Sequence, residues 1–493
     1  MSLKQAAFTA ARWTAIGAVV RSALQFGQVV VLTRLLVPED FGLMAVAVSV
    51  MGFAGIISDL GVSSAIIHRQ DTTADQLSTL YWVNVASGIG VMLLVVGVSP
   101  LVAGIYGDAR LRDLLLIAAL SFPVLALGQQ LRVRAEKELR FGAVALMEIG
   151  AATAGFVVTI ALALAGFGVM SLVAGLLANA VVATTIAWLT LAHGWRPGLA
   201  FDLRGVRHHL SFGGYMIGNN LTNTVTGMAD VLIGGRVLGP ALLGLFSVPR
   251  NFVLQTQWLI NPVVTRIAFP VMAKVQDDVA ALRMIYLNVL RLTVSATAPL
   301  YVFMMVFAPE LTLLLFGERW AGAASLLRLL ALWGLLRAFA NPVGSLLMAT
   351  GRARLSFQWN VGMVVVVPLV LFWGASLGVV GLAASWVALG LITFVPTWYV
   401  LVRPCCGATL AEYTAQGAVP AGLALAAGAA AYAAALPFEQ PLLRVAVALV
   451  TGGAVYVAGS VFFNRAWTEA LRALLRFDSA AAIGAILPAR PAR

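Results

Sequence analysis

Apolar runs of about 20 residues recur from one end of this chain to the other, with short polar stretches between them. A membrane-spanning helix needs about that length, and the runs lack the strict apolar/polar alternation of a transmembrane β-barrel strand. The pattern predicts an all-α integral membrane protein with about fourteen transmembrane helices. The predicted spans are 13–36, 41–66, 78–99, 113–131, 142–165, 169–192, 211–237, 241–268, 284–308, 324–349, 356–377, 380–401, 417–436 and 443–463.

Positive charge gathers at alternate turns of this pattern. If the N-terminus is cytoplasmic, the cytoplasmic loops and tails hold 20 of the 32 Lys and Arg residues, and the opposite loops hold four. Cytoplasmic loops of membrane proteins carry such an excess. We therefore predict a multi-pass protein with both termini in the cytoplasm. The first apolar segment contains Arg21, which favours a retained span over a cleaved signal peptide.

The chain also repeats itself. Segment Arg34–Met44 returns 202 residues later as Arg236–Phe246, with Arg, Leu, Pro, Gly and Leu in register. Two further pairs of segments match, and the offset drifts from 202 to 216: 106–108 with 316–318, and 139–141 with 355–357. Because six spans is an even number, both copies enter the membrane in the same direction, as a parallel repeat.

The repeat predicts two six-helix lobes. We place the N-terminal lobe at 1–192, a cytoplasmic linker at 193–210 and the C-terminal lobe at 211–402. Two extra spans at 417–463 and a cytoplasmic tail at 464–493 complete the chain. Internal repeats of this kind are typical of transporters, whose substrates bind between the two copies.

Composition narrows the functional classes. The chain is 61% hydrophobic and 11% charged, with a net charge of +12, which arginines at the inner ends of spans explain without a nucleic-acid partner. The two cysteines, Cys405 and Cys406, are adjacent, so neither a disulfide framework nor a metal site is expected. We find no nucleotide-binding or hydrolase motif and expect no cofactor. No loop is long enough for a catalytic domain, which argues against an enzyme.

Polar residues inside spans carry the candidate chemistry, because a charge in the membrane interior costs about 2.5–3.5 kcal/mol on insertion scales. Arg21, Gln25 and Gln28 share one helix face, and Asn219, Asn223 and Asp230 share a face in the corresponding span of the second half. Two such faces are expected to line a central cavity. Further candidates are Asp59, Arg250, Gln257, Asn261, Arg266 and Arg337. Since guanidinium groups bind phosphate through paired hydrogen bonds, the excess of arginine favours an anionic, phosphate-bearing substrate.

Structural roles remain open for the same residues. The arginines near span ends can extend to the interface or bond helix-end carbonyls, and Asp59 or Asp230 can pair with an arginine. The Asn and Gln side chains can join helices by hydrogen bonds. Glu39 and Asp40 form an acidic pair in an outer turn, but the second copy has Ala241 and Leu242 there, which disfavours a catalytic role.

Three stretches carry a family resemblance: Leu32–Leu43, Ser58–Gly61 and Phe269–Asp278. Through them the chain resembles the Wzx-like group of polysaccharide and lipopolysaccharide biosynthesis flippases, which includes the colanic acid exporter. That group belongs to the multidrug/oligosaccharidyl-lipid/polysaccharide exporter superfamily.

The resemblance implies a bacterial inner-membrane transporter with a cationic cavity between two lobes. It would flip an isoprenoid-diphosphate-linked oligosaccharide to the outer leaflet by alternating access, for surface polysaccharide synthesis. The partners implied are this lipid-linked substrate, membrane lipids, and polysaccharide polymerase and chain-length machinery.

Three other functions stay open from sequence alone. A drug or cation antiporter of the same superfamily would favour carboxylates in the cavity, which the arginine in the first span disfavours. A membrane polysaccharide polymerase or glycosyltransferase would need a catalytic outer loop. A scaffold without transport activity would tolerate loss of Arg21 and Arg250.

Overall fold

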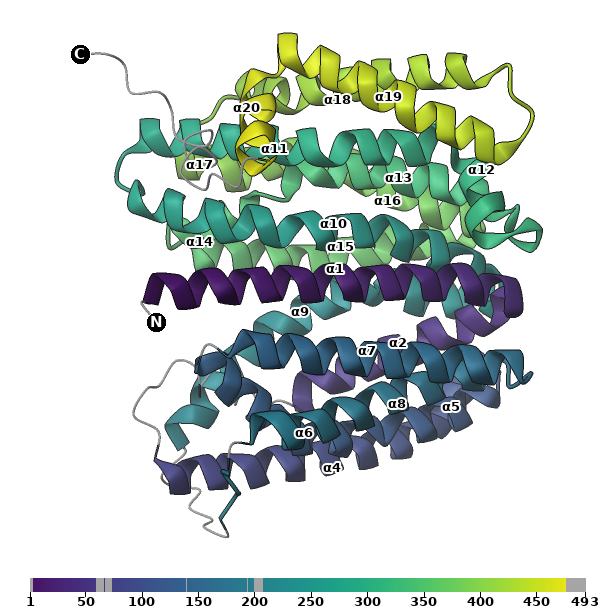
Figure 1. Cartoon of the computed structure of the whole chain (residues 1–493), viewed down its shortest axis with the longest axis vertical. Coiled ribbons are helices and arrows are strands. Elements are labelled where there is room, and N and C mark those ends of the chain that lie inside the picture. Colours follow the sequence, from purple (N-terminus) through teal and green to yellow (C-terminus); the bar gives the residue numbers. More distant parts are fainter. Residues whose placement is uncertain are drawn as a thin grey trace. The chain divides into compact units, whose positions relative to one another are not determined.

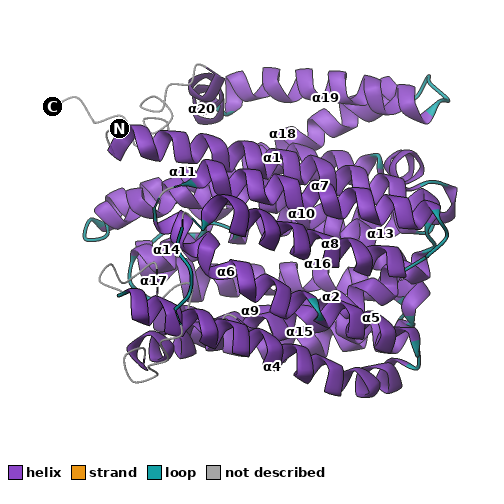
Figure 2. Cartoon of the chain, turned by 60° about the horizontal axis from the view of Figure 1, so that its bottom comes forward, coloured by secondary structure: helices purple, strands orange, loops and turns teal. Residues whose placement is uncertain are grey.

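The structure is a computed structural model that describes residues 3–58, 66, 73–138, 140–192, 194–198 and 207–475. Within these ranges, the side chains of 3–12, 57, 207–220, 258–267 and 473–475 are outside the described set. Among the described residues every regular element is helical (Figure 2). Within the part of the chain that the structure describes, twelve helical segments are long and apolar enough to cross a membrane. The all-α membrane class predicted from sequence is therefore confirmed.

The chain divides into two compact units, Met1–Ser247 and Val248–Arg493. Unit 1 contains α1 (Leu3–Leu35), α2 (Pro38–Ser58), α4 (Ala74–Tyr106), α5 (Arg110–Ala119), α6 (Ser121–Lys137), α7 (Phe141–Leu164), α8 (Met170–Ile186) and α9 (Arg207–Leu238), and the first turns of α10 (Pro240–Lys274). Unit 2 contains the rest of α10, then α11 (Val279–Val306), α12 (Ala308–Leu311), α13 (Ala323–Ala340), α14 (Val343–Ala349), α15 (Ala353–Ser376), α16 (Val379–Pro396), α17 (Arg403–Cys406), α18 (Leu410–Ala435), α19 (Pro441–Phe463) and α20 (Arg465–Leu475). Figure 1 follows this order by colour.

Helices α9 and α10 occupy the predicted spans 211–237 and 241–268. They run for 32 and 35 residues, which is ample to cross a bilayer. The side chains of 207–220 and 258–267 lie outside the described set, and the remaining parts of the two helices are not among the twelve apolar segments. Their polar residues, such as Asn223 and Gln257, lower their mean hydropathy. The count of fourteen spans thus stays a prediction, as does the division into lobes at 193–210.

The repeat is visible in the shapes of the helices. One span of each half is broken, by Leu120 between α5 and α6 and by residues 341–342 between α13 and α14. The next helix is 24 residues long in both halves, as α7 and α15. The residues before them, Arg140 and Arg352, have φ/ψ of −85°/47° and −87°/46°. The structural offset at this point is 212, four residues less than the sequence pairing of 139–141 with 355–357.

A π-helical turn ends the last span of each half. The two turns are Ala187–Leu191 after α8 and Thr397–Val402 after α16, an offset of 210 at their first residues. Each contains a tryptophan at the same position, and each indole Nε1 donates to a backbone carbonyl. Trp188 donates to Leu127 over 3.0 Å, and Trp398 donates to Ala408 over 2.8 Å. The halves therefore share an irregular feature that apolar patterning alone does not reveal.

The two copies of the repeated Pro-x-x-x-Gly motif pack against each other within unit 1. A methyl group on Gly42 would overlap the carbonyl of Pro240, and one on Gly244 would overlap the carbonyl of Pro38. Each glycine thus accommodates the backbone of the opposite copy at the start of α2 or α10. Gly239, just before the second copy, has φ of +79°, which glycine adopts without a Cβ penalty.

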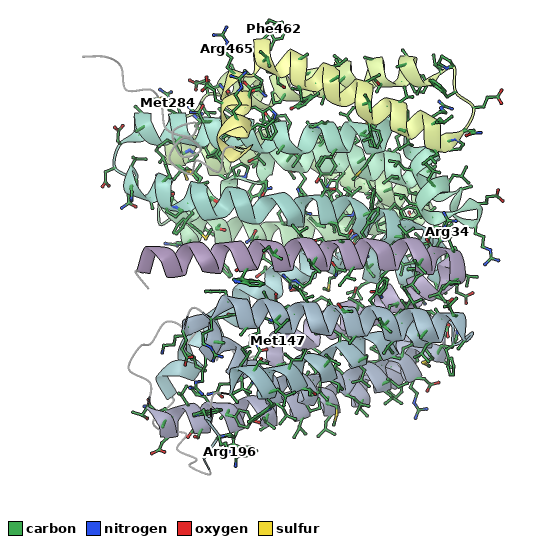
Figure 3. The ribbon with its side chains drawn as sticks, in the orientation of Figure 1. Arg34, Met147, Arg196, Met284, Phe462 and Arg465 are labelled. Carbon is green, nitrogen blue, oxygen red and sulfur yellow. The ribbon has the colours of Figure 1, made fainter. Side chains whose placement is uncertain are left out.

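In unit 2, the C-terminal helices are joined to α11 by a polar clamp. Arg291 on α11 donates from Nε to Asn464 Oδ1 over 2.8 Å and from Nη2 to the Phe463 carbonyl over 2.7 Å. Asn464 is fully buried and donates to Ser295 Oγ over 2.7 Å. The arginine therefore satisfies a carbonyl in the last turn of α19, where the C=O groups have no partner within the helix itself. Beyond the clamp, α20 turns sharply away from α19 (Figure 1), and Phe462 and Arg465 project outward at this corner (Figure 3).

Candidate functional site

The first candidate site lies in unit 1, where α1 packs side by side with α7. A methyl group on Gly17 would lie 3.3 Å from Ala145 Cβ, and one on Gly142 would lie 3.4 Å from the ring of Trp13. The paired residues are separated by almost the same number of residues in both contacts, 128 for Gly17 and Ala145 and 129 for Trp13 and Gly142. The two helices therefore run parallel and in register. Small residues at these positions let the backbones approach closely. Arg21, one turn beyond Gly17, is thereby placed level with Glu148 of α7.

Glu148 bridges two arginines. Its Oε2 lies 3.2 Å from Arg21 Nη1, and its Oε1 lies 3.0 Å from Arg132 Nη2 on α6. Arg132 also donates from Nε to Glu136 over 2.9 Å. We call these four residues the charge cluster. It brings three helices together through two guanidinium groups and two carboxylates.

The sequence prediction found only one member of this cluster. Glu148 is the only Asp or Glu between residues 141 and 170, and that isolation inside an apolar span was the available signal. It lies seven residues past the start of α7, about 10 Å along the axis. The predicted span 113–131 stops one residue before Arg132, whereas α6 continues as helix to Lys137.

Exposure differs between the acid and the bases of the cluster. The Glu148 side chain is 16% exposed, whereas those of Arg21 and Arg132 are 42% and 43% exposed. The carboxylate thus lies deeper, and both guanidinium groups retain accessible surface. Such a pair of guanidinium groups can bind a phosphate-bearing molecule.

The other predicted residues of unit 1 differ in their surroundings. Gln25 and Asn223 are exposed, and Gln28 is partly buried. Asp230 is fully buried, and its Oδ1 accepts from the amide of Val231 over 2.9 Å. Among the described side chains of unit 1, Arg21 therefore pairs with Glu148, whereas neither Gln25 nor Gln28 forms a hydrogen bond with Arg21 or Glu148.

In unit 2, Arg250 and Gln257 lie two turns apart on one face of α10. Both are buried, with 8% and 6% of their surface exposed. Among the described side chains, Gln257 Nε2 meets no acceptor. A buried donor without a partner costs about 1–3 kcal/mol, which a polar ligand or water would recover.

Arg337 on α13 is exposed, and its guanidinium carbon lies 5.2 Å from the centroid of the Trp333 ring. Trp333 packs in turn on Trp386 of α16, with ring centroids 4.7 Å apart. Cation–π contact with a packed tryptophan limits the rotamers of the arginine and so fixes its direction.

Four predicted residues cannot be placed. Asp59 and the side chains of Asn219, Asn261 and Arg266 lie outside the described residues. The resemblance segment Ser58–Gly61 falls there too, apart from Ser58.

The acidic pair in the first outer turn has structural partners. Glu39 forms an ion pair with Arg110, which also bonds Asp108 at 2.7 Å. This arginine holds the pKa of Asp108 below its usual range, mainly through its side-chain hydrogen bond. Asp40 accepts from the amide of Val37 over 3.3 Å at the start of α2. The geometry therefore favours helix capping and loop pairing over catalysis at this turn.

Comparisons with known proteins agree with the family predicted from sequence. A model of the polysaccharide biosynthesis protein family matches residues 31–325. The lipopolysaccharide biosynthesis protein WzxC of Escherichia coli (strain K12) is 31% identical over 443 residues, which is 90% of each chain. The succinoglycan biosynthesis transport protein ExoT of Rhizobium meliloti (strain 1021) is 26% identical over 393 residues, 79% of each chain.

The fold is also found in a solved structure. The lipid II flippase MurJ, in an inward closed conformation, superposes with a TM-score of 0.71 over 91% of this chain and 98% of its own, at 13% identity. At that identity the likeness shows a shared fold and no more. The family model and the relative in Escherichia coli, in contrast, span most of the sequence with its repeated motif, and they establish that this chain belongs to the polysaccharide biosynthesis protein family.

Proposed function

We propose that this protein is a flippase that moves an isoprenoid-diphosphate-linked oligosaccharide from the cytoplasmic to the periplasmic leaflet of the bacterial inner membrane. The relatives support this role, since one is named a succinoglycan biosynthesis transport protein and another a lipopolysaccharide biosynthesis protein. Both termini are proposed to be cytoplasmic, as the distribution of Lys and Arg predicts.

The distribution of charge in unit 2 is the main observation that supports an anionic substrate. Helix α10 and the spans Val279–Val306, Ala323–Ala349, Ala353–Ser376 and Val379–Cys406 contain no Asp or Glu. They contain several arginines well inside their ends, among them Arg250 and Arg337. A substrate with a diphosphate would supply the negative charge that these helices lack, and guanidinium groups suit it because they bind phosphate oxygens in pairs.

A cation antiporter fits this arrangement less well. Such a protein needs carboxylates that are available to a cation, and the Glu148 carboxylate is engaged by two guanidinium groups. A membrane enzyme is not favoured either, because the outer acidic pair Glu39 and Asp40 is used in loop contacts.

Alternating access between the two repeat halves would carry the substrate across, with the lipid tail remaining in the membrane. The remaining proposed partners are membrane lipids and the polymerase and chain-length proteins that would receive the translocated unit.

The test is made in a strain that lacks the protein. Its lipids are extracted and searched by mass spectrometry for isoprenoid-diphosphate oligosaccharides, and surface polysaccharide is assayed in parallel. Accumulation of complete repeat units together with loss of surface polymer is the expected result. Unchanged lipid-linked intermediates and intact polymer, in a strain with no second flippase, would overturn the proposal.

Replacement of Arg21 and Arg250 by Ala separates transport from scaffolding. We expect both variants to reach wild-type abundance in the membrane but to restore less than about a tenth of the surface polymer, since each removes a charged contact worth about 1.4 kcal/mol or more. Full restoration by both variants would point to a scaffold.

A further inference from the structure

We propose that Glu148 is an internal counter-ion, which occupies the guanidinium groups of Arg21 and Arg132 until the diphosphate of the substrate displaces it. This inference rests on the proposed function and adds a binding site for the headgroup within unit 1. It adds Arg132 and Glu148 to the residues that act on the substrate.

The geometry of the carboxylate is the first argument. Glu148 uses one oxygen for each arginine, at 3.2 Å and 3.0 Å. A carboxylate that bridges two guanidinium groups holds them at the spacing that neighbouring anionic oxygens require. The oxygens of a diphosphate can make the same contacts, and each phosphate adds acceptor oxygens for guanidinium N–H donors that one carboxylate cannot satisfy.

The charge balance of the cluster is the second argument. Two guanidinium groups face two carboxylates, Glu148 and Glu136, so the cluster is neutral by formal charge without a substrate. Neutrality lowers the cost of keeping arginines inside a membrane-spanning unit. A site that is empty during part of each transport cycle gains stability from such an internal partner.

The exposure of the arginines is the third argument. More than two-fifths of each arginine side chain is accessible, whereas Glu148 lies deeper on α7. An incoming phosphate would therefore meet the guanidinium groups first. Glu148 could then give up its bonds by a rotamer change without movement of α1 or α6.

The proposal predicts that replacing the acid and replacing either base change the affinity for a diphosphate in opposite directions. Glu148→Gln removes the competing charge, so farnesyl diphosphate should bind about tenfold more tightly than to the wild type. Arg21→Gln and Arg132→Gln each remove a contact and should weaken binding about tenfold. Glu148→Gln should nevertheless restore less surface polymer than the wild type, because a substrate that is held too tightly is released slowly.

Binding is measured by calorimetry on the full chain in lipid nanodiscs, with farnesyl diphosphate and with inorganic pyrophosphate. Glu138→Gln is the matched control, since it makes the same change at an exposed carboxylate in unit 1 outside the cluster, and its affinity should equal that of the wild type. Glu148→Asp is the second acidic variant. It keeps the charge but shortens the reach, so its affinity for the probe should lie between that of the wild type and that of Glu148→Gln. Thermal melting confirms that each variant is folded.

The same order of affinities with both probes would identify the diphosphate as the recognised group. If Glu148→Gln binds farnesyl diphosphate more weakly than the wild type or equally well, Glu148 is a structural residue and the inference is overturned. An effect confined to farnesyl diphosphate would overturn the assignment to the headgroup. The proposed function fails separately, if wild-type protein binds neither probe and its loss leaves lipid-linked intermediates unchanged.

Discussion

The arginines within the helices of this protein have two different roles: some join helices together, and others keep surface that a ligand can reach. Arg291 is committed to the end of α19 and to Asn464, so its position inside a span reflects packing. Arg21 and Arg132 instead share a carboxylate and keep accessible surface. The sequence alone shows how far each arginine lies from the end of its span, but it does not show whether the arginine binds another part of the protein or a substrate. The distinction needs the partner, which lies 173 residues away for Arg291 and 127 residues away for Arg21.

The clamp can be tested at a single residue. Asn464→Ala removes the acceptor of Arg291 Nε and the donor to Ser295, and should lower the free energy of unfolding by about 2 kcal/mol. A fall of the melting temperature in detergent, measured by intrinsic fluorescence, checks this. Glu439→Ala, at an exposed residue between α18 and α19, is the control and should melt like the wild type. Equal melting temperatures for all three proteins would show that the clamp adds no stability.

At the scale of elements, patterning predicted the helices well where they are apolar and less well where they are polar. In place of the single predicted span 113–131, the structure has two helices, α5 and α6. Helix α6 continues to Lys137, through a charged sequence that is typical of a loop. The predicted span 380–401 ends in a π-helical turn. In both cases, contacts with neighbouring helices determine where the helix ends or where a π-helical turn forms. These contacts belong to the tertiary structure and cannot be read from the pattern of one segment.

The reciprocal glycine contact also lay beyond sequence reasoning, although both copies of the motif were found. Their mutual packing could not be read from a spacing of 202 residues. Gly42→Ala and Gly244→Ala should each destabilise the protein by about 1–3 kcal/mol, since the added methyl group meets backbone rather than a flexible side chain. Gly97→Ala in α4, where a methyl group meets no atom within 4 Å, should not destabilise the protein and should add up to about 1 kcal/mol of stability, since alanine favours a helix over glycine.

The reciprocity of this contact predicts non-additivity. Once one glycine is replaced and the backbones have moved apart, the second replacement should cost less, so the double variant should lose less stability than the two single variants together. Urea or thermal unfolding of the four proteins measures the coupling. Strict additivity would mean that the two glycines act independently.

For the whole molecule, sequence predicted the class, the family and the repeat, while the substrate site remains a proposal. The described halves share broken spans and helix lengths, which follow from the repeat that the motif revealed. The charge cluster required the register of α1 on α7, set by Gly17 and Gly142. No pattern along either helix alone fixes that register.

The predicted topology can be checked on the intact protein. Glu439→Cys, between α18 and α19, should react with a membrane-impermeant maleimide in intact spheroplasts, whereas Gln276→Cys, between α10 and α11, should react only after permeabilisation. The native cysteines are buried, with 6% and 0% exposure for Cys405 and Cys406, so background labelling should be low. Labelling of Gln276→Cys from outside would contradict cytoplasmic termini.

The paired π-helical turns bear on the history of the chain. A π-helical turn arises when a helix carries one residue more than its α-helical register accommodates. Here the extra residue occurs at the same place in both halves, next to Trp188 and Trp398. One insertion in an ancestral gene of six spans, followed by duplication and fusion of that gene, accounts for both turns. The alternative requires the same insertion twice at equivalent sites, so a single insertion before the duplication is the simpler history.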